Sequence, residues 1–345
     1  MITNIEKLGN GLTVSVDWLS FTVFDMSLED VVSLLGYTMP DFGKLPKGGH
    51  GYKCRIKLNG YDISVLYDGT PDMGIHVEAS GKSMGELLRS YKQTLLNKDC
   101  PFGECYDLDF DESCLSSLLS NIHSVGRVTR LDLAIDDIDG LYFSVKDVED
   151  YYISGQVVSK LRCARSTHGL GMFSGIGHTL YFGSGKSDVM LRVYDKQAEM
   201  NRSLPDDSKI EFPWIRWELE TKKDRAESIS SMIRSGLSLG AVAVGVLGGY
   251  VRIINLDDSN RSRCSLLEKW RMFMSDMQVL KLRQIKYEKT LDEKREWVKR
   301  QVMPTLTAII LADGGSLEFV ENNMEQGLNR MNQSLYDMAM GELDN

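Results

Sequence analysis

Cysteine and histidine, the residues that build zinc sites and disulfide frameworks, are scarce in this 345-residue chain. Of its six cysteines, only Cys100 and Cys105 lie close together, at a spacing wider than Cys-x-x-Cys. Because no second pair exists, a zinc-ribbon type of site is excluded and the thiols are expected to be reduced. None of the five histidines forms a His-x-His pair, so a metal site built on that strand pattern is excluded too.

A long hydrophobic run is also missing. The longest apolar stretch, residues 236–251, is short and contains five glycines, which makes it a poor membrane span and favours a buried element. The N-terminal residues contain no apolar segment of signal-peptide length. We therefore expect a soluble, cytoplasmic protein with no membrane partner.

Positive charge is not in excess. The chain has 40 Lys and Arg against 49 Asp and Glu, a net charge of -9, so it cannot present a uniformly basic surface. Any polyanionic partner must meet a local basic patch instead. Residues 252–300 carry 13 basic against 8 acidic residues, whereas residues 312–345 carry 1 against 7. A solvated helix face explains such runs as readily as a contact with a partner does.

Strand and helix signals follow one another in the same order twice. In residues 1–125 the order is a strand at 12–24, a helix opened by Ser27, a hairpin around Asn59-Gly60, a strand at 74–79 and a helix at 83–96. In residues 126–255 the order is repeated by a strand at 127–136, a helix opened by Ser144, a hairpin at 178–195, a strand at 213–221 and a helix at 224–235. A duplication and a chance similarity of common elements are both compatible with this pattern.

These elements predict an α+β fold with a helical C-terminal region. We expect two related halves that form a curved, largely antiparallel sheet with helices packed on it. The predicted domains are residues 1–125 for nucleic-acid binding, 126–255 for chemistry, and a helical region with an acidic tail at 256–345. Apolar residues at helical spacing over 265–302, followed by Pro304, support the last of these.

Two predicted strands carry paired acids on one face. Alternation groups Arg130, Asp132 and Asp136, with the two carboxylates about 7 Å apart along the strand. It likewise groups Arg216 with the acids of the other strand, Glu218 and Glu220. If the strands are neighbours, their oxygens suit Mg²⁺ or Mn²⁺ better than zinc. An ordinary salt-bridged solvent face is the alternative.

A third strand places one tyrosine between two cations. Arg192, Tyr194 and Lys196 share a face at the end of the second hairpin. Nearby positive charge or a metal lowers the pKa of a phenol, so Tyr194 is a candidate nucleophile, with Arg192 or Lys196 stabilising the phenolate. A half-exposed strand tyrosine beside a cation is the alternative.

Two further patterns are weaker. The string SGKS at 80–83 and 184–187 lacks the upstream glycine of a phosphate-binding loop, so nucleotide hydrolysis by that route is excluded. Five basic residues near Tyr52 form a patch suited to a phosphate backbone: Lys44, Lys47, Lys53, Arg55 and Lys57. A simple solvated hairpin is the alternative.

Four strings, in order, resemble the Rep-trans family of replication initiation factors: VDWLSFTV at 16–23, RLDLAIDD at 130–137, HTLYFGSGKSDVMLRVYDKQAE at 178–199 and WIRWELE at 214–220. The resemblance covers about residues 12–310 and is most specific around the third string. It implies a metal-dependent nickase that cuts one strand of origin DNA, as in rolling-circle initiators of plasmids and phages and in relaxases of conjugative elements.

The resemblance also implies roles for individual residues. The tyrosine of the family's Tyr-x-Lys motif falls on Tyr194 with Lys196, and Glu199 matches a nearby acid. The acidic motifs fall on Asp132, Asp136, Glu218 and Glu220, the expected ligands of Mg²⁺ or Mn²⁺. The implied product is a 5′-phosphotyrosine that allows the strand to be rejoined.

Expected partners are origin DNA, as duplex and as single strand, a host helicase and a second copy of the chain. We expect DNA contacts from six basic residues: Arg130, Lys186, Arg216, Lys53, Arg55 and Lys57. The 158–166 stretch and the basic helix near 281–300 are further candidates for reading the origin. A non-catalytic origin-binding regulator and a metal-dependent hydrolytic nuclease are the alternatives for the function.

Overall fold

The fold is taken from a computed structural model, which describes residues 6–8, 12–81, 83–99, 112–169, 177–202, 209–275 and 298–329 and isolated positions beyond them. Residues 1–283 form one compact unit and residues 284–345 a second. The predicted domain boundaries at 125/126 and 255/256 stay predictions.

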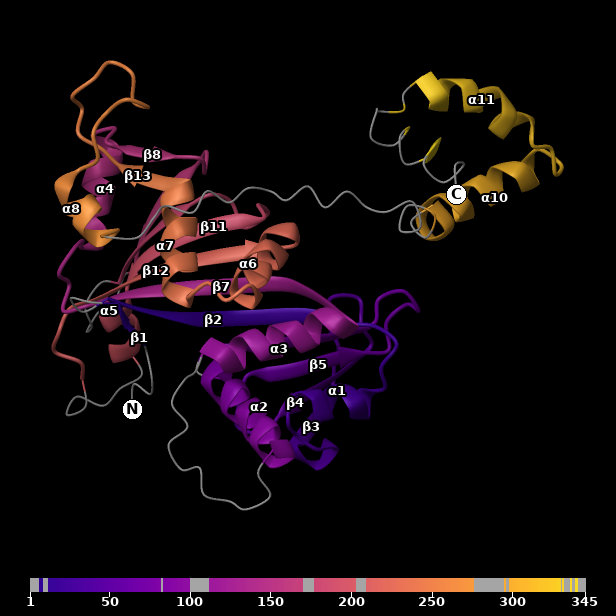
Figure 1. Ribbon diagram of the computed structural model, residues 1–345, viewed down its shortest axis with the longest axis horizontal. Helices are drawn as coiled ribbons and strands as arrows, with labels where there is room; N and C mark the ends of the chain where they lie inside the picture. The colour runs from indigo at the N-terminus through magenta and orange to yellow at the C-terminus, as the bar shows by residue number, and fades with distance from the viewer. Residues whose placement is uncertain are drawn as a thin grey trace. The chain divides into compact units, whose positions relative to one another are not determined.

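The first unit is built on one large antiparallel sheet with the strand order β3-β4-β5-β6-β2-β7-β12-β11-β10-β9, and β1 pairs with β2 (Figure 1). Its strands are β1 (Glu6–Leu8), β2 (Leu12–Val23), β3 (Phe42–Leu45), β4 (Cys54–Leu58), β5 (Ile63–Tyr67), β6 (Ile75–Ser80), β7 (Gly126–Ile138), β9 (Ala164–His168), β10 (His178–Phe182), β11 (Val189–Asp195) and β12 (Trp214–Lys222). A small second sheet pairs β8 (Val157–Ser159) with β13 (Val251–Ile253).

The helices of the first unit are α1 (Leu28–Leu34), the 3₁₀ helix η1 (Met39–Asp41), α2 (Ser83–Asp99), α3 (Glu112–Val125), α4 (Val145–Ile153), α5 (Lys196–Asn201), α6 (Asp224–Arg234), α7 (Leu239–Tyr250) and α8 (Glu268–Phe273). The helices α2, α3, α6 and α7 cover one face of the sheet (Figure 1). Apolar residues alternate on the strands with polar ones, so that face holds the core and leaves the other face polar.

The predicted α+β fold is confirmed, and the two halves join through a single strand pair. The central strands β2 and β7 pair antiparallel, and the hairpins β4–β5 and β10–β11 lie outward from them on opposite sides. The predicted helix starts are both capping boxes, Ser27 with Asp30 and Ser144 with Asp147. The repeated order in the sequence therefore corresponds to a repeated arrangement around the β2–β7 pair.

Some elements differ from the expectations. Most of the glycine-rich stretch 236–251 is buried, as the helix α7 followed by β13, because its apolar side chains pack against β2 and β7. Its first residues, including Leu237, are exposed. Helix α3 and the short strands β3, β8 and β9 carried no clear sequence signal. Of the helix expected over 265–302, α8 is present, and Trp270 and Phe273 pack on Trp217 of the sheet. Residues 276–294, with most of the basic helix, lie outside the described residues.

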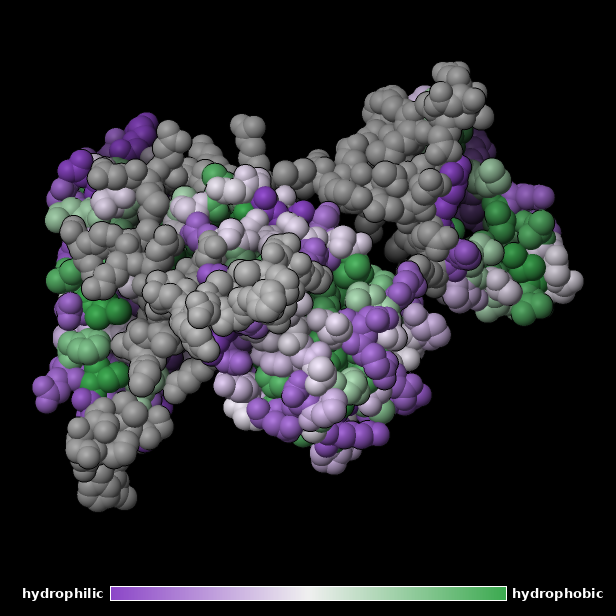
Figure 2. All heavy atoms as spheres, turned by 60° about the horizontal axis from the view of Figure 1, so that its bottom comes forward, coloured by the Kyte–Doolittle hydropathy of each residue, from purple (hydrophilic) through white to green (hydrophobic). Residues whose placement is uncertain are grey.

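The second unit contains a π-helical turn (Val298–Val302), α10 (Met303–Ala312) and α11 (Glu318–Asn329). Several apolar side chains are exposed on these helices, including Leu311 and Met324. Figure 2 shows hydrophobic residues on the surface of this unit. No helix in the described part of the chain is both long and apolar enough to cross a membrane.

Candidate active site on the polar face of the sheet

Three neighbouring strands bring the predicted site residues onto one face. Across β7 and β12, Asp132 lies opposite Glu220 and Asp136 lies opposite Arg216. Across β12 and β11, Glu218 lies opposite Arg192 and Arg216 opposite Tyr194. Since side chains alternate along a strand, all of them project from the face that the core helices leave uncovered. We call this the polar face.

Tyr194 lies in hydrogen-bonding contact with a carboxylate. Its hydroxyl donates to Oε2 of Glu218 at 3.2 Å, and Nζ of Lys196 lies 5.7 Å from the centre of its ring. Burial raises the pKa of the Tyr194 phenol, and the charge of Glu218 adds to this, while Arg216 opposes it. The expected lowering of this pKa by flanking cations is therefore wrong for the protein without a metal, because Arg192 and Lys196 are neutralised by Glu218 and Glu199.

Glu218 connects the tyrosine to Arg192. Its Oε1 accepts a hydrogen bond from Arg192 while its Oε2 accepts from Tyr194. The side chain is 2% exposed, and this burial raises the pKa of Glu218 above its ordinary value, against the opposing charge of Arg192. A carboxylate whose pKa is raised toward neutrality is a better proton acceptor at physiological pH.

Asp132 and Glu220 share one arginine. Nε of Arg130 lies 3.1 and 3.0 Å from the two carboxylate oxygens of Asp132, and its Nη2 lies 2.9 Å from Glu220. Burial raises the pKa of Asp132 to about 7, and the neighbouring Glu218 and Glu220 charges add to the rise, although Arg130 opposes it. The guanidinium of Arg130 also lies 4.2 Å from the centre of the Trp18 ring.

Asp136 is engaged in a buried ion pair. Arg216 donates from Nε to Oδ1 at 2.7 Å and from Nη2 to Oδ2 at 2.9 Å, and the Trp214 indole donates to Oδ1 at 2.6 Å. Nη1 of Arg216 reaches Asp17 at 2.7 Å. Because Arg216 is 7% exposed and held from both sides, its predicted role in contacting DNA has little geometric support.

The acidic residues differ in how well they fit a divalent cation. Asp132, Glu218 and Glu220 offer hard oxygen donors on adjacent strands. Because Asp132 and Glu220 lie directly opposite each other, their negative charges repel, and a bound positive charge reduces this repulsion. Asp136 fits poorly, because both its oxygens already accept from Arg216. Within the described ranges, these acids do not bring three ligand atoms within 4.8 Å of one another, and their carboxylates are paired with Arg130 and Arg192.

The remaining basic residues predicted to bind DNA are mostly paired with acids. Lys53 lies 3.7 Å from Asp68, and Lys57 lies 2.6 Å from Asp62. Arg55 donates to Ser64 and lies 3.7 Å from Glu78. Lys186 is exposed at the tip of the β10–β11 hairpin. Exposed pairs of this kind are worth little, so a phosphate can displace the acid.

Sequence reasoning missed Asp17 as part of the site. It lies at a β-bulge in β2, where the register with β7 shifts between Val16 and Trp18, and its carboxylate reaches Arg216. The string VDWLSFTV contained the residue, but simple alternation cannot predict a bulge. Glu78 was missed as well, and it gathers His50, His76 and Arg55 around one carboxylate on the polar face of the first half.

Comparison with known proteins agrees with this geometry. The family model described as "Replication initiation factor" matches residues 126–326, which include all three site strands. The chain belongs to this family. It is 25% identical over 346 residues to "Putative DNA relaxase NicK" of Bacillus subtilis (strain 168), covering 98% of this chain and 93% of that protein. The structure is also similar to that of a rolling circle replication initiator protein from Geobacillus stearothermophilus, with a TM-score of 0.62 and 28% identity over 79% of this chain and 99% of the other. The expected resemblance to this family is thereby confirmed.

Proposed function

We propose that this protein is a rolling-circle replication initiator or relaxase that nicks one strand of origin DNA through Tyr194. The observation that carries the proposal is the contact of the Tyr194 hydroxyl with Glu218, 3.2 Å away on the polar face that also holds Asp132 and Glu220. A phenol beside a proton acceptor and a group of hard oxygen ligands is the arrangement that covalent phosphoryl transfer requires.

Glu218 takes the proton when Tyr194 attacks. The phenol oxygen forms a bond to the phosphorus of the scissile phosphate, its proton passes to Oε2 of Glu218, and the bond to the 3′ oxygen breaks. The 3′ oxygen takes up a proton from solvent and leaves as a hydroxyl, and the 5′ end stays on Tyr194 through its phosphate. Because the covalent bond conserves the energy of the phosphodiester, the reverse reaction rejoins the strand without a nucleotide cofactor.

The other charged residues around Tyr194 bind the metal ion or stabilise negative charge. Asp132, Glu218 and Glu220 would hold Mg²⁺ or Mn²⁺, which supplies neutralisation of charge on the phosphate oxygens. Arg192, which pairs with Glu218 in the free protein, would pair with the phosphate once that carboxylate has taken up the proton. Lys196 stabilises the developing charge from the other side of the Tyr194 ring.

The polar face gives the DNA strand a path away from the tyrosine. Aromatic rings on it already stack with guanidinium groups, since Arg130 lies over Trp18 and Arg165 lies 4.6 Å from the centre of Tyr181. Bases stack on such rings whatever the sequence, while arginines contact the backbone. The free 3′ hydroxyl primes synthesis, and a host helicase extends the opening. Nicking and rejoining through Tyr194 are common to an initiator and a relaxase, and to one copy of the chain or two.

Glu218→Gln tests the proton transfer. We expect nicking of single-stranded origin DNA to slow by about 10²–10⁴-fold near neutral pH, because the amide cannot take the phenol proton. The loss should shrink as the pH rises toward the pKa of the tyrosine, which then ionises without help. The matched variant Glu220→Gln removes a carboxylate that does not touch Tyr194, so its deficit should not shrink as the pH rises toward the pKa of the tyrosine. Parallel pH profiles for the two variants would remove Glu218 from this role.

Salt dependence tests the DNA partner. If about five phosphates contact the basic side chains, affinity for single-stranded origin DNA should fall roughly a hundredfold between about 50 and 200 mM salt, despite the net charge of -9. The measurement is fluorescence anisotropy of labelled oligonucleotides. An affinity that does not change with salt would argue against a nucleic-acid partner.

Two other functions have distinct signatures. A non-catalytic origin-binding regulator would bind origin DNA but form no covalent adduct with it. A metal-dependent hydrolytic nuclease would cut without Tyr194, through water activated by the carboxylates. The intact pairing of Tyr194 with Glu218 favours the covalent mechanism over both.

A further inference from the structure

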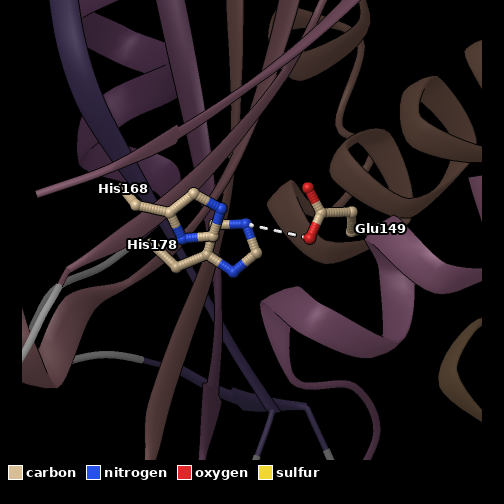
Figure 3. Close-up of side chains that lie close together, drawn as sticks. All are labelled: Glu149, His168 and His178. Carbon is tan, nitrogen blue, oxygen red and sulfur yellow. Dashed lines mark ion pairs between the residues drawn. The ribbon is translucent and has the colours of Figure 1, made fainter.

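A second group of ligand-type side chains lies away from the tyrosine. Within the described ranges, Glu149, His168 and His178 each offer one ligand atom, and the three atoms lie within 4.8 Å of one another (Figure 3). Glu149 comes from α4, His168 from the end of β9 and His178 from the start of β10. These residues are not among the predicted metal ligands, and their positions in the sequence gave no metal-binding pattern.

This group lies on the face opposite Tyr194. In the register of β10 and β11, Thr179 lies across from Tyr194, so the preceding residue, His178, points to the other face of the sheet. The contact of His178 with helix α4 agrees with this, since α4 packs on β10 from the core side. The group is therefore separate from the carboxylates Asp132, Glu218 and Glu220.

We propose that Glu149, His168 and His178 form a binding site for a divalent transition metal ion of the zinc type. The Nε2 atom of His178 lies 3.6 Å from Oε2 of Glu149. That separation is too long for a hydrogen bond but close to the distance of about 3.4 Å between two ligands on one tetrahedral zinc ion, given bonds of about 2.0–2.1 Å. Two imidazoles with one carboxylate form a common three-ligand zinc set that leaves a fourth position open.

The two imidazoles each bring one nitrogen close to the same hydroxyl group. His168 and His178 lie directly opposite each other on paired strands, and their rings stack with centroids 4.2 Å apart. The hydroxyl of Ser166 lies 3.0 Å from Nε2 of His178 and 3.4 Å from Nε2 of His168, so both nitrogens face the same small region. Two rings this close cannot both carry a proton at low cost.

A metal here would link an edge hairpin to a helix. The ligands come from β9, β10 and α4, and β10 pairs directly with β11, the strand that carries Tyr194. An ion bound by all three would hold the outer strands of the sheet against α4. Its role would be to support the strand that carries the tyrosine, because it has no access to the polar face.

Metal titration of the full-length, chelator-stripped protein tests this site. We expect Co²⁺ to produce the visible absorption of a tetrahedral nitrogen–oxygen site, and Zn²⁺ to displace it with a stoichiometry of one. His168→Ala should abolish the absorption and weaken Zn²⁺ binding at least about tenfold, and Glu149→Gln should weaken it as well. His168 is exposed, so its replacement is expected to leave the fold intact, which circular dichroism checks.

Matched controls separate this site from the proposed nicking centre. His123→Ala removes an exposed histidine that is paired with Glu227 instead, and it should bind Co²⁺ like the unmodified protein. Tyr194→Phe and Asp132→Asn should also keep the Co²⁺ absorption, even where nicking is lost. Equal Co²⁺ and Zn²⁺ binding by His168→Ala and the unmodified protein would overturn the proposal.

Discussion

Tyr194→Phe should abolish the covalent complex between the protein and origin DNA. Phe retains the ring that packs beside Lys196 but has no oxygen to attack phosphorus, so nicking should fall by at least about 10³-fold. The measurement uses single-stranded origin DNA labelled on the 5′ side and on the 3′ side of the nick in separate reactions, with Mg²⁺ or Mn²⁺. Only the 3′-side fragment, which carries the 5′ phosphate, should stay on the protein.

Tyr67→Phe is the matched control for that experiment. Tyr67 lies at the end of the hairpin strand β5 and is followed by an aspartate, as Tyr194 near the end of β11 is followed by Asp195. The strands beside Tyr67 are β4 and β6 and not the acidic strands β7 and β12. This variant should form the adduct at the normal rate. If Tyr194→Phe still cut DNA, water would be the nucleophile and the hydrolytic nuclease would be the correct function.

Asp136→Ala should destabilise the protein strongly. It leaves the guanidinium of Arg216 buried without its bidentate partner, and breaking a buried ion pair in this way costs about 3–5 kcal/mol. The free energy of unfolding, from urea denaturation in metal-free buffer, measures the loss. The double variant Asp136→Ala/Arg216→Met should recover part of it, because no charge then stays buried.

The same variant decides whether Asp136 acts as a metal ligand. A ligand role predicts a small loss of stability in metal-free buffer and a nicking defect that excess Mn²⁺ relieves. The hydrogen bonds of Asp136 to Arg216 and Trp214 predict the opposite, a large loss of stability that Mn²⁺ does not restore. A loss below about 1 kcal/mol would contradict the structural role.

Much of the site could be predicted from strand alternation alone. The period of two groups Asp132 with Asp136 and Glu218 with Glu220, and the register of β7 with β12 agrees with this grouping. Leu131 and Leu133 lie in the buried core. The local signals Asn59-Gly60 and the Ser-x-x-Asp caps fixed the hairpin and the helix starts, because turns and caps depend on neighbours in the chain. The fold class followed from the order of these elements.

Pairing between distant strands could not be predicted in this way. That β12 lies between β7 and β11 is what sets Glu218 against Tyr194, and nothing local to either strand encodes it. The sequence also could not show which acids pair with which cations. It therefore suggested a lowered pKa for Tyr194, whereas burial and the charge of Glu218 raise that pKa. Asp17 reached the site only because a β-bulge turns it toward Arg216.

The sequence by itself determined the elements, the two-fold repetition of their order, the family, and which residue types share each strand face. Only the tertiary structure decided how the carboxylates are paired: Asp136 is held by Arg216, whereas Asp132 and Glu220 share Arg130 and Glu218 pairs with Arg192. It alone also brought Glu149 to His168 and His178. The physical reason is that periodicity and turn chemistry act over a few residues, whereas ion pairs and metal sites form between strands that meet only in the folded sheet.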